Sequence, residues 1–139
     1  MFQKIIIVGH LGRDPEMRCT PTGASVTNFP LATTRVFPGA DGEQRKETAW
    51  FRVTAWGKLG EVCNQYLHKG SKVLIEGRLS VDPATGGPRI YQKQDGTAGA
   101  SFEVTAGEVK FLSSRTAAEE TAPEHELPPG SPTTDDLPF

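Results

Sequence analysis

Residues 48–62 read TAWFRVTAWGKLGEV, and this stretch decides the predicted fold. Successive side chains of an extended strand point to opposite faces. Alternate residues of the stretch form an apolar face that suits a protein core: Phe51, Val53 and Ala55. The opposite face carries aromatic, cationic and polar side chains: Trp50, Arg52, Thr54 and Trp56. The stretch therefore predicts a strand over residues 47–56, with a core on one side and two tryptophans on the other.

A helix is predicted directly after this strand, from about Lys58 to His68. Its apolar residues recur at the three- and four-residue spacing of one helical stripe: Leu59, Val62, Cys63, Tyr66 and Leu67. Lys69 and Gly70 then supply a basic last turn and a glycine stop.

The rest of the first 111 residues reads as strands separated by glycine- and proline-rich turns. We expect further strands over residues 4–9, 25–36, 72–81 and 101–111, with a hairpin loop over 37–44 and a loop-rich segment over 82–100. Pro30 lacks a backbone N–H, so we expect its position at a bulge or an edge. Five strands with one helix between the third and fourth predict an all-β protein, a five-stranded Greek-key OB barrel. The pattern alone also allows another type of small β-barrel.

The C-terminal part of the chain differs in composition. Residues 1–111 contain 14 Lys and Arg against 11 Asp and Glu, whereas residues 112–139 contain one Arg against six acidic residues. The second segment has five prolines and no apolar periodicity, so it cannot bury enough surface to offset its chain entropy. We therefore expect a folded, mildly basic domain over 1–111, a disordered acidic linker over 112–134 and an acidic tip over 135–139. A basic folded domain hints at nucleic-acid binding.

The aromatic row of the 47–56 strand is the strongest functional signal. Exposure of an indole to water is unfavourable, so we expect a ligand or a protein neighbour to cover Trp50 and Trp56. Rings alternating with a cation suit a ligand with flat rings and negative charge, and the two indoles lie about 20 Å apart at about 3.3 Å per residue. That span fits several nucleotides, whose bases stack on aromatic rings while cations contact phosphates. The alternative is that the row packs against a helix or another subunit.

Other residues are weaker candidates for the same surface. Phe37, at the base of the predicted hairpin loop, and Tyr91, in the 82–100 segment, extend the platform or serve local packing. The candidate phosphate contacts are cationic: Arg35, Arg45, Lys46, Arg52, Lys58, Lys72, Arg78 and Arg89. Scattered Lys and Arg are also typical of an ordinary solvated surface.

The sequence offers little for catalysis or metal binding. The cysteines and histidines lack metal-ligand spacing, and we expect Cys19 and Cys63 to be buried free thiols. No phosphate-binding loop, serine-hydrolase or zinc-protease motif is present. No apolar run approaches the roughly 20 residues of a membrane span, and the first residues do not resemble a signal peptide. We expect a cytoplasmic protein that is not an enzyme, with no cofactor, metal or membrane partner.

Several motifs together resemble the bacterial single-stranded DNA-binding proteins, an OB-fold family. VGHLGRDPEMR (8–18) is similar to the family pattern VGNLGxDPExR, and four further stretches follow in the family's order and spacing: NFPLAT (28–33), TAWFRVTAWGKLGEV (48–62), YLHKGSKVLIEGRL (66–79) and FEV (102–104). RIYQKQDG (89–96) resembles a loop segment of the family, and DDLPF (135–139) resembles its acidic C-terminal tip. DPATGGP (82–88) looks like an insertion.

The resemblance implies a function and a set of contact residues. It implies sequence-independent binding and protection of single-stranded DNA during replication, recombination and repair. It also implies a nucleoid-associated homotetramer with one OB domain per chain. By position, Trp50, Trp56 and Phe37 match stacking aromatics of the family, and Tyr91 matches a fourth.

The tip is expected to recruit partner proteins. It combines two acidic groups with an apolar ring and an α-carboxylate at a chain end: Asp135, Asp136, Leu137, Pro138 and Phe139. A hydrophobic socket with a basic rim can capture such an end, and the resemblance implies that replication, recombination and repair enzymes do so. The alternative is a solubilising acidic tether.

Two other functions fit parts of the pattern. One is a protein-interaction module, an OB barrel whose aromatic face is an interface. The other is an RNA-binding OB domain of the cold-shock type, although such domains are shorter and lack an acidic tip with a terminal Phe.

Overall fold

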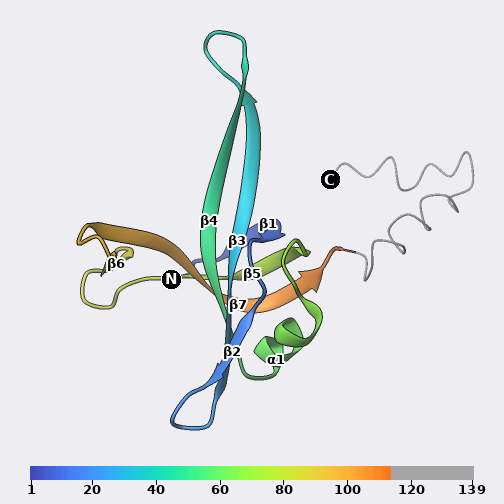
Figure 1. Ribbon diagram of the computed structural model, residues 1–139, viewed down its shortest axis with the longest axis vertical. Coiled ribbons are helices and arrows are strands. Elements are labelled where there is room, and N and C mark those ends of the chain that lie inside the picture. The colour runs from blue at the N-terminus through green and yellow to red at the C-terminus, as the bar shows by residue number, and fades with distance from the viewer. Residues whose placement is uncertain (114–139) are drawn as a thin grey trace, which may run out of the picture.

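The computed structural model describes residues 1–113, so the predicted tip and the linker from residue 114 onward lie outside the described residues. Within them the elements follow in this order: β1 (Ile5–Leu11), β2 (Glu16–Cys19), β3 (Ser25–Pro38), β4 (Gln44–Trp56), α1 (Gly57–Tyr66), β5 (Lys72–Ser80), β6 (Arg89–Gln92) and β7 (Ala98–Phe111). Figure 1 shows a central body from which the β3–β4 hairpin and the β6–β7 hairpin project as two arms.

Five strands close into a barrel. β1 pairs antiparallel with β5 and, at His10 and Leu11, with β3. β3 pairs antiparallel with β4, β4 pairs parallel with β7, and β7 pairs antiparallel with β5, which completes the ring. α1 stands between β4 and β5, the third and fourth barrel strands. The predicted OB barrel is confirmed, and β2 and β6 extend it as additional hairpin strands.

The core consists of the inward-facing residues of the barrel strands and of α1. Its fully buried members include Leu31, Val53, Val73, Ile75 and Val104. α1 packs closely on the sheet at Gly60, where a Cβ atom would lie 2.4 Å from the carbonyl oxygen of Ala55. The buried hydroxyl of Thr27 donates a hydrogen bond to the Gly60 carbonyl at 2.7 Å. This contact fixes α1 directly after the strand that carries both tryptophans.

The two arms are more regular than the sequence predicts. The turn after β3 is confined to residues 39–43, where the Gly39 amide donates to the Glu43 carbonyl at 2.6 Å, so both flanking strands are longer than expected. Tyr91 lies on β6 rather than in a loop, paired with Gly99 of β7. The Asp95-Gly96 pair supplies that hairpin's turn, with Gly96 at φ +90°. A turn signal in the 82–100 segment was therefore missed.

The segment around β2 also differs from the prediction. Residues 16–19 lie outside the expected strands, yet they pair with β3, because the Thr20 amide donates to the Ala24 carbonyl at 2.7 Å and folds the chain back. Cys19 is exposed on this edge strand, so its predicted burial is wrong. Cys63 is buried in the core as predicted, and burial raises the pKa of its thiol to about 11.

Pro30 interrupts nothing in the β3–β4 pairing, where it stands opposite Arg52 in unbroken register. Its carbonyl accepts a hydrogen bond from the Gly12 amide at 3.0 Å, so its nitrogen also points away from β4. On that side the neighbour of β3 changes from β2 to β1. The missing N–H therefore falls in the gap between two neighbouring strands, and the β3–β4 ladder contains no bulge there.

The described chain continues past the predicted domain boundary at residue 111. The amides of Leu112 and Ser113 donate to the Lys72 carbonyl at 2.9 and 3.2 Å, and the Ser113 hydroxyl accepts a hydrogen bond from the Lys72 amide. These bonds hold the end of the described chain against β5.

Candidate functional site

The outer face of β4 carries the predicted row of side chains. Trp50 and Trp56 are 53% and 50% exposed, whereas Val53 and Ala55 between them are fully buried. The Thr54 hydroxyl donates to Oδ1 of Asn28 on β3 at 2.8 Å, so within residues 1–113 the Asn28 amide nitrogen is still available as a donor. The predicted alternation of faces is confirmed. Within residues 1–113 no helix covers the row.

A groove with a volume of about 570 Å³ opens at the Trp50 end of this row. It brings Trp50 and Arg52 of β4 together with Arg89 and Tyr91 of β6. Four predicted site residues from two strands, β4 and β6, thus line one surface. Arg13, in the turn after β1, also lines the groove and was missed. It stands within the quoted VGHLGRDPEMR motif, but it shares the groove with Trp50 only because the end of β1 pairs with β3, the neighbour of β4.

The groove carries a small excess of positive charge. Three arginines line it against the two carboxylates of Glu16 and Glu103. Arg89 is partly neutralised, because its Nε lies 3.6 Å from Oε1 of Glu103, whose side chain is only 19% exposed. Within residues 1–113, Arg13 and Arg52 form no ion pair. Their guanidinium groups are therefore available to an anion, and their planar shape also allows stacking on flat rings.

Trp56 continues the row beyond the groove. It ends β4 opposite Val26 of β3 and forms the N-cap of α1. The exposed side chain of Lys58 follows in the first turn of that helix. The six residues from Trp50 to Trp56 correspond to about 20 Å of extended strand, so the two indoles mark the ends of a track rather than one pocket.

The β3–β4 arm holds Phe37 and Arg35 in contact with each other. The guanidinium carbon of Arg35 lies 4.4 Å from the centroid of the Phe37 ring, and Nη2 of Arg35 lies 3.5 Å from Oε1 of Glu47. Phe37 pairs with Arg45, so it lies on the same face of the β3–β4 sheet as Phe51 and on the opposite face from Trp50. Arg45 itself pairs with Asp41 across the turn at 3.0 Å. Lys46 lies on the same face of β4 as Trp50 and is exposed.

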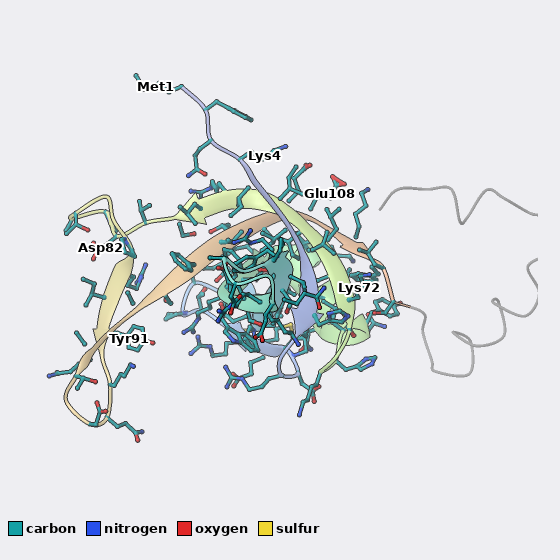
Figure 2. All side chains as sticks on the ribbon, turned by 90° about the horizontal axis from the view of Figure 1, so that it is seen from above. Met1, Lys4, Lys72, Asp82, Tyr91 and Glu108 are labelled. Atoms are coloured by element: carbon teal, nitrogen blue, oxygen red, sulfur yellow. The ribbon has the colours of Figure 1, made fainter. Side chains whose placement is uncertain are left out.

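Two predicted phosphate contacts lie away from this surface. Lys72 lines a different, largely apolar groove with Tyr66 of α1 and Phe111 of β7. Arg78 lines a third hollow, on the β5–β7 side of the barrel. Figure 2 shows Lys72 and Tyr91 on opposite sides of the molecule. Scattered cations in the sequence thus fall on several faces of the closed barrel.

Residues 1–113 contain neither a metal-binding cluster nor a membrane-spanning helix. No group of three or more His, Cys, Asp and Glu residues within 1–113 is placed to hold a metal ion. The helix of this part of the chain falls short of the length and apolarity of a membrane span.

Comparison with known proteins gives a consistent match. Residues 2–112 match the model of the single-strand binding protein family. A single-stranded DNA-binding protein of Neisseria meningitidis is 37% identical over 125 residues, which is 90% of this chain and 68% of that protein. Single-stranded DNA-binding protein 1 of Chlorobaculum tepidum is 53% identical over 78 residues, 56% of this chain. That match spans only 48% of the relative's own length.

A solved structure supports the fold. The Plasmodium falciparum SSB complex with ssDNA superposes with a TM-score of 0.67 at 22% sequence identity, covering 81% of this chain and 97% of that one.

Proposed function

Because the chain belongs to the single-strand binding protein family, we propose that it binds single-stranded DNA without regard to sequence. The observation that carries this proposal is the outer face of β4, where two half-exposed tryptophans flank Arg52. Every DNA base offers a flat face for stacking, so such a row holds a strand of any sequence. Exposed bases are a property of single strands, because duplex DNA buries them in its own stack.

The groove at Trp50 fits this function. Arg13 and Arg52 supply the cations that follow a phosphate backbone, while Trp50 of β4 and Tyr91 of β6 supply the rings. Each phosphate neutralised on a single strand should contribute about −0.7 to the slope of log affinity against log salt. Lys58, beyond Trp56, extends the same track, whereas Lys72 and Arg78 would meet DNA only if the strand wraps around the barrel.

Competition between nucleic acids tests the proposal. A labelled dT oligomer bound to the protein should be displaced by unlabelled dT of equal length at a far lower concentration than by rU or by a duplex. Equal or better displacement by rU would assign the chain to the RNA-binding OB domains instead. Absence of binding to all three would leave the aromatic face as a protein interface.

We propose further that the chain forms a homotetramer. One edge of β1 pairs with β5 along Ile5–His10, but on the other edge, within residues 1–113, only His10 and Leu11 pair with β3. Ile6 and Val8 on this strand are 57% and 43% exposed. An open strand edge with exposed apolar side chains favours coverage by a second copy. Several OB domains around one centre would also give the DNA a longer path.

Native mass spectrometry tests the assembly. The wild-type protein should be a tetramer at micromolar concentration, and Ile6→Glu/Val8→Glu should shift it to smaller species, because the charges would be buried in the interface. Val36→Glu is the matched control, since Val36 is 54% exposed on the projecting β3–β4 arm. A wild-type monomer, or an unchanged tetramer in the double variant, would contradict this proposal.

Residues 135–139 would add a recruiting role. We propose that DDLPF docks enzymes of replication, recombination and repair, which would place the protein in the cytoplasm on the nucleoid. The support is the sequence itself: two acidic residues beside Leu137 and Phe139 suit an apolar socket with a basic rim.

A further inference from the structure

The chain leaves β1 at Gly12 and passes directly against the indole of Trp50. A Cβ atom built on Gly12 would lie 2.6 Å from Cζ3 and 2.9 Å from Cη2 of Trp50. These two atoms form the outer edge of the six-membered ring. Ordinary van der Waals contact begins near 3.4 Å, so a methyl group at residue 12 would displace the ring edge by about 0.8 Å.

Conformational freedom does not account for a glycine at this position. Six glycines of residues 1–113 have a positive φ, and Gly12 is not among them. An alanine could adopt the same backbone there without the strain of a left-handed conformation. The missing side chain of Gly12 therefore matters for the space that it leaves.

The backbone beside Gly12 is held from both sides, so the ring would have to yield. The Gly12 amide donates to the Pro30 carbonyl at 3.0 Å, and the preceding Leu11 exchanges hydrogen bonds of 2.9 Å with Gly70 and Ser71. Trp50, in contrast, is half exposed, and its register partner on β3 is the small Ala32. The indole can thus reach across β3 to β1, where its edge rests on Gly12.

We propose that Gly12 is a positioning residue for Trp50: it seats the edge of the indole and holds the ring in the pose in which a base stacks on it. This inference rests on the proposed DNA-binding function and deepens it by naming a residue that acts through Trp50. A ring free to tilt would stack less often and would lose conformational entropy on binding.

The test uses the full chain with Trp56→Phe, so that Trp50 is the sole tryptophan. Adding Gly12→Ala should shift the emission maximum of the free protein and weaken binding of oligo(dT) by about three- to tenfold, less than the full loss of a stacking ring. Gly87→Ala is the matched control, because its methyl group would meet only Thr85 Oγ1, at 3.7 Å. It should change neither readout. Unchanged emission and affinity in Gly12→Ala at equal thermal stability would overturn the inference.

A second parent variant, Trp50→Phe, distinguishes an effect of the methyl group on the indole from an effect on the backbone. Trp50→Phe has a smaller ring and leaves room for the methyl group, so adding Gly12→Ala to it should change affinity by less than about twofold and leave the thermal stability unchanged. The same loss of oligo(dT) affinity in this background, or failure of the double variant to fold, would show that the methyl group acts on the backbone. Either result would refute the proposal that Gly12 positions Trp50. The emission shift is measured without DNA, so it tests the contact between Gly12 and Trp50 even if the chain proves not to bind DNA.

Discussion

The Trp50→Ala/Trp56→Ala variant should lose most of its affinity for single-stranded DNA while keeping its fold. Both side chains are about half exposed, so their removal leaves the core of Val53 and Ala55 intact. Stacking of one base is worth about 1–3 kcal/mol, a range taken from single-strand-binding proteins as a class. The two rings are about 20 Å apart along the strand, so their losses should add to about 2–6 kcal/mol.

Binding of this variant should be followed by the anisotropy of a labelled oligo(dT), since the protein then has no tryptophan to report. The control is Tyr66→Ala, which removes an aromatic side chain that is 59% exposed but lies on α1 beside Phe111, away from the row. The control should bind within about twofold of the wild type. An affinity of the double variant equally close to the wild type would remove β4 from the DNA site.

The second large effect concerns the tip. Deletion of residues 135–139 should abolish capture of partner enzymes while DNA affinity stays equal or becomes slightly tighter at low salt, because an acidic segment competes weakly for a basic groove and salt screens that competition. Phe139→Ala alone should lose the partners as well, since the ring is the apolar anchor. Pro138 restricts the backbone of the segment and lowers the cost of ordering it.

The measurement is a pull-down from cell extract with wild-type, truncated and Phe139→Ala protein. Leu127→Ala is the matched control, because it removes an apolar side chain outside the tip. It should retain every partner that the wild type captures. If the truncated and Phe139→Ala proteins also retain the same partners, the segment is only a solubilising tether.

The sequence predicted the barrel and the tryptophan row because β4 carries an unusually clear pattern. Its alternate residues separate a core face from an aromatic face, and α1 follows with a single apolar stripe. A strand of alternating residues has only two faces, so assigning Val53 to the core assigns Trp50 to the outside.

The short strands escaped prediction for a physical reason. β2 and β6 have four residues each, and all eight are exposed, so neither has an apolar alternation to detect. Their pairing depends on turns at Thr20–Ala24 and Lys93–Thr97. The prediction that Cys19 is buried was wrong for the same reason, because Cys19 lies on β2.

The composition of the groove required the closed barrel. Arg13 lines the same groove as Trp50 because the end of β1 pairs with β3, and Arg89 is restrained by Glu103 of a neighbouring strand. Lys72, Arg78 and Arg52 are all cations on predicted strands, but strand pairing places the three on different faces of the barrel. Charge along a sequence therefore identifies candidates, and only the fold decides which of them share a surface.

The central claim, that the outer face of β4 binds single-stranded DNA by stacking, is tested most directly by titrating the wild-type protein with oligo(dT) and recording tryptophan emission. Both tryptophans lie on that face, so bound bases should quench the emission strongly and saturably, and duplex DNA should not. Binding of oligo(dT) by anisotropy with unchanged tryptophan emission would contradict the claim, because the DNA would then lie elsewhere on the barrel.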